Sequence, residues 1–455
     1  MTTTTLWAET ALLEIGWADA VRVDLAAGRI VAVTVGAQPA GQRLGCLLPA
    51  PTNLHSHAFQ RAMAGLTEQR GAGGQDSFWT WRQVMYRFLD HLTPDDVQAI
   101  AAFVQMEMLE AGYAGVAEFH YLHHRPDGVP YADLAEMAGR IVAAASESGI
   151  GLTLLPVLYQ QGGCDGRALG AGQVRFGNDP DRFARLWQGA GRALACLPPD
   201  AVLGVAPHSL RAVTRGGLAQ VAELAPDAPI HIHLAEQQAE VAEVEAAWGA
   251  RPVAWLLANA AVDSRWCAIH CTQMQPTETL ALAASGAVAG LCPITEANLG
   301  DGIFDGLRYL GAGGRFGIGS DSNLRIALAE ELRLLEYGQR LRERGRAVLA
   351  SPTRSTGRAL FEGAVQGGAR AAGRDAGAIR TGAWADLLAL EMGAVDLAGR
   401  TGDEVLDAWI FAGDDRMVAE LWAAGRHLVT GGRHIARDAL TARYRACVAR
   451  LRGRS

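Results

Sequence analysis

Leu47-Leu-Pro-Ala-Pro-Thr-Asn-Leu-His-Ser-His57 is an apolar run that ends in two histidines. Residues 47–54 predict a buried β-strand, and side chains two positions apart on a strand point to the same face. His55 and His57 would therefore offer two imidazoles to one point at the end of this strand. Taken alone, the pair fits equally well one surface histidine and one core histidine, so the rest of the chain has to decide.

The composition describes an ordinary globular chain. Of its 455 residues, 49% are hydrophobic and 20% charged, and a net charge of −7 favours neither nucleic acid nor an anionic membrane as partner. No apolar run is long enough to span a bilayer, and the first residues lack the basic and apolar segments of a signal peptide. Seven cysteines without a Cys-x-x-Cys pair fit reduced thiols. We therefore expect a cytoplasmic protein.

The chain contains no lysine, since all 41 basic residues are arginine. This excludes every mechanism that needs a lysine side chain, among them Schiff-base chemistry, a P-loop, and a carbamylated lysine that bridges two metal ions.

The chain falls into segments with two different patterns of apolar and polar residues. Residues 1–48 alternate apolar and polar positions, which predicts a small antiparallel sheet. From residue 49 to 379, short apolar strands alternate with longer helical stretches, as in repeated βα units. A helix is expected to start at Thr93-Pro94 and to stop at Gly112. The expected barrel strands are 47–54, 116–121, 152–159, 202–207, 230–234, 267–271, 287–292 and 316–320.

Strand patterns return near the C-terminus, at 381–390, 418–423 and 427–430, followed by a helix at 438–452. We expect residues 380–455 to complete the sheet that residues 1–48 begin. The predicted fold class is therefore α/β, a TIM-like (β/α)8 barrel over 49–379 plus a small, discontinuous β-sandwich domain. In such barrels the chemistry lies at the C-terminal ends of the strands.

Ionisable residues follow four of the predicted barrel strands. His55 and His57 end the first strand, His233 and Glu236 follow the fifth, His270 ends the sixth, and Asp321 follows the eighth. Because these strand ends meet at one face of a barrel, the side chains should converge. Three imidazoles and a carboxylate suit a divalent first-row metal, and zinc fits best. We expect one ion, bound by His55, His57, His233 and Asp321.

The remaining residues around the predicted ion have separate interpretations. Glu236 would act as general base and then general acid, and His270 would polarise the substrate or stabilise an intermediate. His231 should face away from the ion and be structural. His208, after the fourth strand, offers a histidine for a second metal, although one metal is favoured. Cys267 and Cys271 would face opposite to His270 as core thiols.

The segment after the first strand gives substrate clues. Gly71–Gly74, followed by Phe78-Trp-Thr-Trp81, suggests either a lid over the barrel mouth or an ordinary surface loop. Arg82 and Arg211 could each hold a carboxylate through two hydrogen bonds.

The whole pattern resembles the amidohydrolase superfamily, and His-Leu-Ala-Glu236 resembles its single-metal deaminase branch. The run Asn53-Leu-His-Ser-His-Ala-Phe-Gln-Arg-Ala-Met-Ala-Gly-Leu-Thr-Glu68 is similar to the formimidoylglutamate deiminases (N-formimino-L-glutamate iminohydrolases). Further matches are Phe78-Trp-Thr-Trp-Arg82, Glu118-Phe-His-Tyr-Leu-His-His124 and Ala206-Pro-His-Ser-Leu-Arg211. Pro49-Ala-Pro-Thr52 departs from the family, which more often has a Pro-Gly start.

The resemblance implies a hydrolase acting on non-peptide C–N bonds, which converts the dicarboxylate N-formimino-L-glutamate to N-formyl-L-glutamate and ammonia in histidine degradation. It implies the metal ligands already named, Glu236, His270 and Asp321 as catalytic residues, and a homodimer. The implied substrate contacts are Gln60, Arg82, Tyr121, His208 and Arg211.

Two alternatives stay open. A related deaminase for a purine base or nucleoside, of the guanine or adenosylhomocysteine type, would use stacking aromatics such as Trp79 and Trp81. A non-catalytic metal-binding protein is the other, although it would have no need for Glu236.

Overall fold

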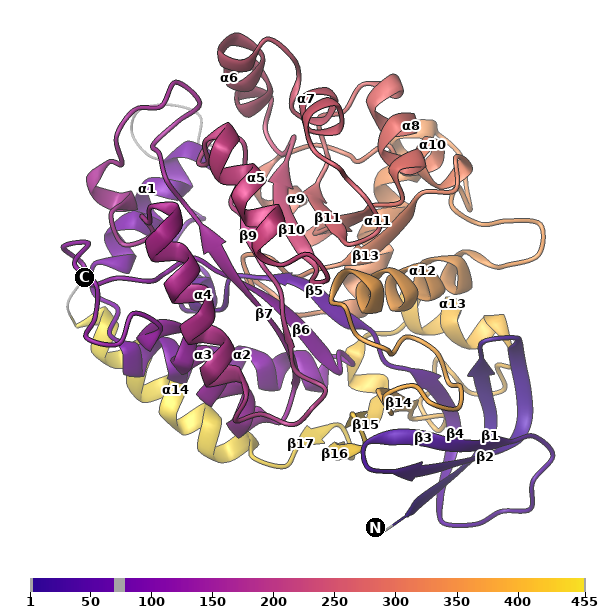
Figure 1. Cartoon of the computed structure of the whole chain (residues 1–455). Coiled ribbons are helices and arrows are strands. Elements are labelled where there is room, and N and C mark those ends of the chain that lie inside the picture. Colours follow the sequence, from indigo (N-terminus) through magenta and orange to yellow (C-terminus); the bar gives the residue numbers. More distant parts are fainter. Residues whose placement is uncertain (1–2, 69–77, 454–455) are drawn as a thin grey trace.

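The computed structural model describes residues 3–68 and 78–453, so the predicted lid segment at 71–74 lies outside the described residues. Figure 1 shows a barrel of strands surrounded by helices, with a small sheet at its lower right. The predicted α/β fold is confirmed. The boundaries at 1–48, 49–379 and 380–455 stay a prediction.

Parallel strands form the barrel. They are β5 (Thr52–Ser56), β6 (Gly115–His120), β7 (Gly151–Leu158), β8 (Val202–Leu203) with β9 (Ala206–Pro207), β10 (Ile230–Leu234), β11 (Trp266–His270), β12 (Val288–Leu291) and β13 (Arg315–Ile318). Parallel pairing runs from β5 to β9 and from β10 to β13. Isolated bridges join the two groups into a closed ring, Val205 with Ile230 and Ser209 with His233 at one junction and Ser56 with Asp321 at the other.

Two of the predicted barrel strands are each interrupted in the structure. Residues 47–54 do not form one strand, because β4 (Gln42–Pro49) belongs to the small sheet and β5 starts at Thr52. Pro49 and Pro51 lack the N–H that a continuous ladder needs. The predicted strand at 202–207 is divided into β8 and β9 at Gly204, after which Val205 bridges to β10.

The small domain is one hydrogen-bonded sheet built from both ends of the chain. Its order is β17-β16-β15-β14-β4-β1-β2-β3. The remaining strands are β1 (Thr4–Leu13), β2 (Gly16–Ala26), β3 (Arg29–Thr34), β14 (Leu387–Leu390), β15 (Val418–Ala423), β16 (Arg426–Thr430) and β17 (Arg433–His434). The prediction of a purely antiparallel N-terminal sheet is wrong, because β4 returns along β1 in the parallel direction. The predicted strand at 381–390 shortens to β14.

Helices cover the barrel. They are α1 (Phe78–Leu89), α2 (Pro94–Glu110), α3 (Glu136–Ser148), α4 (Pro180–Leu194), α5 (Arg215–Leu224), α6 (Gln238–Trp248), α7 (Pro252–Asn259), α8 (Pro276–Ser285), α9 (Pro293–Leu299), α10 (Gly306–Gly311), α11 (Leu328–Glu343), α12 (Thr356–Ala371), α13 (Asp403–Phe411) and α14 (Arg437–Arg452), with short 3₁₀ turns η1 (Ala58–Met63), η2 (Ala171–Gln173) and η3 (Asp415–Met417). Thr93 caps α2 as predicted, and its side chain exchanges hydrogen bonds with Asp96. Within the described residues, none of these helices has the length and apolar character to cross a lipid bilayer.

The barrel closes where β5 meets the loop after β13. The His57 N–H donates to Asp321 O at 3.0 Å, and the Asp321 N–H donates to His55 O at 2.9 Å. Helix α12 lies directly against this seam at two glycines. A Cβ on Gly367 would be 1.7 Å from Phe316 O, and one on Gly368 would be 2.6 Å from Thr52 O. Only glycine permits this close approach.

A buried ion cluster joins the barrel to the small sheet. The Arg374 guanidinium lies 2.9 Å from Asp386 and 3.1 Å from Asp200, and Arg426 of β16 contacts Asp200 at 2.8 Å. Burial alone raises the pKa of Asp200, but the two arginines outweigh burial and lower it below its ordinary value. The cluster therefore holds charged groups from both parts of the molecule.

We expect Arg374→Met to lower the free energy of unfolding by about 3–5 kcal/mol at pH 7, because two buried carboxylates lose a partner. The pKa of Asp200 is depressed in the folded state, so its contribution is fully present above the ordinary pKa of an aspartate and is lost progressively as the pH falls below that value through the lower folded pKa. Urea unfolding at pH 7 and pH 3.5 should show the difference shrinking in acid. Arg416→Met, at an exposed ion pair, is the control, and an equal loss in both variants would contradict a special role for the cluster.

Candidate active site

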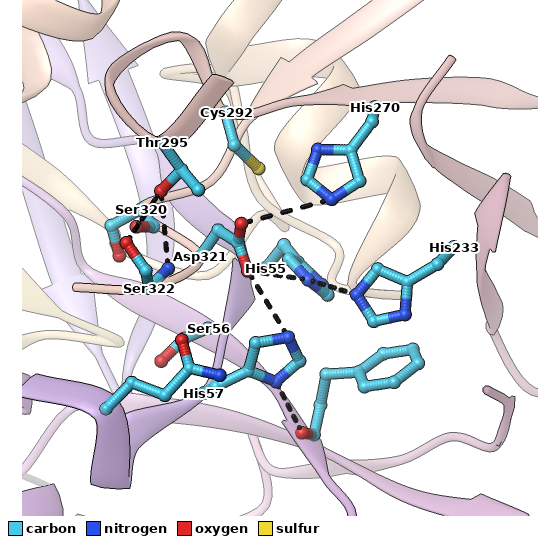
Figure 2. Close-up of polar contacts among 12 residues, drawn as sticks. His55, Ser56, His57, His233, His270, Cys292, Thr295, Ser320, Asp321 and Ser322 are labelled. Carbon is cyan, nitrogen blue, oxygen red and sulfur yellow. Dashed lines mark hydrogen bonds and ion pairs between the residues drawn. The ribbon is translucent and has the colours of Figure 1, made fainter. Parts of the chain in front are cut away.

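Four of the predicted side chains converge at the C-terminal end of the barrel. Ligand atoms of His55, His57, His233 and Asp321 all lie within 4.8 Å of one another, and each residue is buried. His55 Nε2 is 3.1 Å from His233 Nε2, and Asp321 Oδ1 is 3.3 Å from His55 Nε2 and 3.2 Å from His57 Nε2. Figure 2 shows the three rings grouped around the Asp321 carboxylate.

Backbone carbonyls orient two of these rings. His57 Nδ1 lies 3.1 Å from Phe119 O, and His233 Nδ1 lies 3.1 Å from His208 O. A carbonyl only accepts hydrogen bonds, so each Nδ1 carries the proton and each Nε2 keeps a lone pair. Both lone pairs face the same point as Asp321. This is the tautomer that metal-binding histidines generally adopt.

Burial sets the charge of the group. It lowers the pKa of His55 to about 3 and that of His233 well below its usual value, so both rings are neutral at neutral pH. Burial raises the pKa of Asp321, but close contacts with the His55 and His57 rings hold it well below its usual range. Neutral imidazoles and an ionised carboxylate are the forms that bind a metal. The donor set thus fits one divalent ion.

Next to this group lies a second set of charges. Glu236 Oε1 is 3.9 Å from His270 Nε2, and Glu236 Oε2 is 3.5 Å from Arg211 Nη2. Burial raises the pKa of Glu236. Burial lowers the pKa of His270, yet the nearby Glu236, Glu296 and Asp321 outweigh it and raise the pKa to about 10. A carboxylate with a raised pKa beside a cationic imidazole can move a proton and stabilise developing negative charge.

A cavity opens beside these groups and brings together every predicted substrate contact. Gln60 Nε2 donates to Tyr121 OH at 2.9 Å, and Arg82 Nη2 donates to Tyr159 OH at 2.9 Å. His208 Nδ1 lies 3.0 Å from Ser209 Oγ, and the His208 ring stands beside that of His233. The cavity is lined by His57, Gln60, Trp81, Arg82, Met85, Tyr86, Tyr121, Tyr159, Phe176, His208, Arg211, His233, Glu236, His270, Leu299, Asp321 and Ser322.

The structure also shows where the other histidines and cysteines discussed in the sequence lie. His231 faces away and bonds Ala371 O at 2.7 Å, as predicted for a structural residue. Cys267 and Cys271 are buried free thiols. His208 is absent from the donor groups found among the described residues, which contain instead a set that the sequence did not suggest, His270, Cys292 and Asp321.

Four polar residues near the site were missed from the sequence. Tyr159 bonds Arg82. Glu240 accepts the Glu236 N–H at 2.8 Å. Glu296 contacts His270, and Cys292 lies beside Asp321. Tyr159 and Cys292 directly follow barrel strands, so the strand-end rule could have found them. The two glutamates lie on helices, where nothing in the local pattern marks them.

Comparison with known proteins agrees with this geometry. Residues 46–428 match the model of the "Amidohydrolase family", and residues 3–44 match "Formimidoylglutamate deiminase HutF, N-terminal domain". The chain belongs to the amidohydrolase family. A curated formimidoylglutamate deiminase from Pseudomonas aeruginosa is 49% identical over 94% of this chain and 95% of its own length. The resemblance noted in the sequence is thus confirmed, and the protein is a hydrolase.

Other similar proteins are more distant in sequence or carry a broader name. An amidohydrolase of solved structure from Brucella melitensis has a TM-score of 0.95 and 50% identity, covering 98% of this chain and 99% of its own. A 5-methylthioadenosine/S-adenosylhomocysteine deaminase from Natronomonas pharaonis is 28% identical over 92% of this chain and 88% of its own length. An adenosine deaminase structure from Xanthomonas campestris with bound zinc shares the fold, with a TM-score of 0.82 at 22% identity over 99% and 98% of the two chains.

The two histidines of β10 provide a test of the metal group. We expect His233→Ala to lose most of its bound metal, because one of four donors disappears, whereas His231→Ala keeps about one ion per chain. Elemental analysis of the purified variants measures this directly. Equal metal loss from both variants would mean that the group does not bind metal through His233.

Proposed function

We propose that the protein hydrolyses N-formimino-L-glutamate to N-formyl-L-glutamate and ammonia, as a step in histidine degradation. One arrangement carries the proposal: a donor set for one metal ion, a buried carboxylate beside it, and two arginines on the wall of the same cavity. The similarity to a formimidoylglutamate deiminase at 49% identity supports the same reaction.

The proposed metal ligands are His55, His57, His233 and Asp321, with Zn²⁺ as the ion and one ion per subunit. The zinc bound to a neighbour of the same fold and the nitrogen-rich donor set support this choice. When bound, such an ion lowers the pKa of water to about 7 and so provides a nucleophile at neutral pH.

Glu236 and His270 carry the proton chemistry in this proposal. Water oxygen bonds to the formimino carbon while Glu236 removes a proton from that water. Glu236 delivers that proton to the terminal nitrogen as the C=N double bond opens, which gives a tetrahedral carbon that carries an OH and an NH2 group. The OH proton then passes through Glu236 to the same nitrogen, the bond from carbon to that nitrogen breaks as the formyl C=O forms, and ammonia leaves. His270 and Asp321 stabilise the tetrahedral carbon, because His270 Nε2 lies 3.9 Å from both Glu236 Oε1 and Asp321 Oδ2.

The two arginines of the cavity lining suit the glutamate part of the substrate. Arg82 and Arg211 would bind its two carboxylates, which planar guanidinium groups hold through paired hydrogen bonds. The Arg211 side chain is 8% exposed, so a carboxylate there is largely shielded from water. Gln60, Tyr121 and His208 would complete the contacts to the substrate.

A purine or nucleoside deaminase is the second candidate. It is favoured by Trp81 and other aromatic residues on the cavity wall and by the adenosylhomocysteine deaminases among the similar proteins. The lower identity of those proteins, 28% against 49%, places this candidate second.

We also propose a homodimer in the cytoplasm. The homodimer rests on the family resemblance alone. The location is supported by the seven cysteines, all of them free thiols within the described residues, which fits a reducing compartment.

Ammonia release by the metal-loaded protein tests the function. We expect turnover of N-formimino-L-glutamate and none of guanine, adenosine or S-adenosylhomocysteine, because the arginines suit a dicarboxylate. A coupled ammonia assay measures all four substrates under one condition. Turnover of a purine without turnover of N-formimino-L-glutamate would replace the proposal by the second candidate.

Arg211→Met tests the carboxylate-binding wall. Loss of a hydrogen bond to a charged group costs about 1.5–3 kcal/mol, so we expect kcat/KM for N-formimino-L-glutamate to fall by about 10- to 150-fold. Metal content should stay unchanged. Arg215→Met, which removes an arginine stacked on Trp248 away from the cavity lining, is the matched control. Near-normal kinetics in Arg211→Met would remove Arg211 from the substrate site.

A further inference from the structure

A buried carboxylate that the proposed mechanism does not use contacts His270 at Nδ1. Glu296, on α9, is 5% exposed, and its Oε1 lies 3.3 Å from His270 Nδ1. The same oxygen accepts the Cys292 N–H at 2.9 Å. A carboxylate only accepts hydrogen bonds, so Nδ1 carries the proton in this contact. The other ring nitrogen, Nε2, then points into the site.

The backbone at His270 is unusual. His270 has a φ of 70° and Cys271 a φ of 51°, both in the left-handed region that non-glycine residues rarely adopt. The Cys271 N–H donates to Leu234 O at 3.0 Å, which fixes the turn after β11. Such a backbone is strained and persists only where contacts impose it. The turn directs the ring toward α9 and the site together.

We propose that Glu296 is a positioning residue for His270 in the deimination reaction. It fixes the rotamer of the ring, so that Nε2 faces the region between Glu236 and Asp321, where the tetrahedral carbon would lie. A ring free to turn about its side-chain bonds would lose this direction. The inference rests on the proposed function, because His270 must act on the reacting carbon for its direction to matter.

A second buried carboxylate also supports the start of α9, and it allows the positioning of His270 to be distinguished from simple support of that helix. Glu331 of α11 is fully buried, and its Oε2 accepts the Ile294 N–H at 2.8 Å. Glu296 and Glu331 thus bind backbone N–H groups two residues apart at the start of the same helix. Of these two carboxylates, Glu296 also contacts His270, whereas no hydrogen bond or ion pair joins Glu331 to His270 within the described residues. Glu331 is therefore a matched control for damage to the helix.

Three variants test the proposal on the metal-loaded protein, with N-formimino-L-glutamate as substrate. We expect Glu296→Ala to lower kcat by about 10- to 100-fold, as loss of a residue that orients a site histidine typically does, with KM changed less than about threefold. Glu296→Gln should recover most of that loss, because its amide oxygen can still accept both N–H groups. Glu331→Ala should keep kcat near the wild-type value, and all three variants should retain their metal.

Crystal structures of the variants report on the ring without any activity. We expect His270 to be turned or disordered in Glu296→Ala and in place in Glu331→Ala. An unchanged kcat and an unmoved ring in Glu296→Ala would overturn the proposal, as would an equal loss of kcat in Glu331→Ala. If the wild type releases no ammonia from N-formimino-L-glutamate, the proposed function fails, and the position of the ring still decides the role of Glu296.

Discussion

The site depends on two backbone hydrogen bonds that close the barrel. They link His55 and His57 at the end of β5 to Asp321 after β13, at 2.9 and 3.0 Å. The residues that pair across this seam are themselves proposed ligands, so closing the ring of strands also brings the first and last parts of the barrel to the same point. The geometry of the donor group is therefore a property of the fold and not of mobile loops, which is the rigidity that metal sites need.

Neutral and charged side chains occupy different parts of the buried site. Neutral imidazoles of His55 and His233 lie on one side. On the other side, carboxylates of Glu236, Glu296 and Asp321 surround His270 and keep it cationic. Glu236, His270, Glu296 and Asp321 are all buried, so the fields of these groups are screened little. A molecule that enters the cavity meets an environment already arranged for charge that develops during the reaction, at a cost in stability that the surrounding core has to offset.

The sequence predicted the elements whose signals are local. The run at β10, Ile230–Leu234, in which apolar residues alternate with two histidines, was placed without error, and polar residues at strand ends identified the donor group. The break at Pro49 and Pro51 was missed, because a continuous apolar run outweighed two prolines. The parallel pairing of β1 with β4 was missed because pairing direction depends on the path of the chain between strands. Glu240 and Glu296 act through contacts across space, and no spacing in the sequence marks such residues.

The small sheet has a consequence for the order in which the molecule is made. Strand β4 pairs with β14, more than three hundred residues later in the chain. During synthesis on the ribosome, β1 to β4 emerge first and have to wait with one edge unpaired until almost the whole chain has been translated. An uncovered edge of this kind invites pairing with other chains. Slow translation or a C-terminal truncation should therefore lead to aggregation through this edge, even though the residues of the barrel itself are complete.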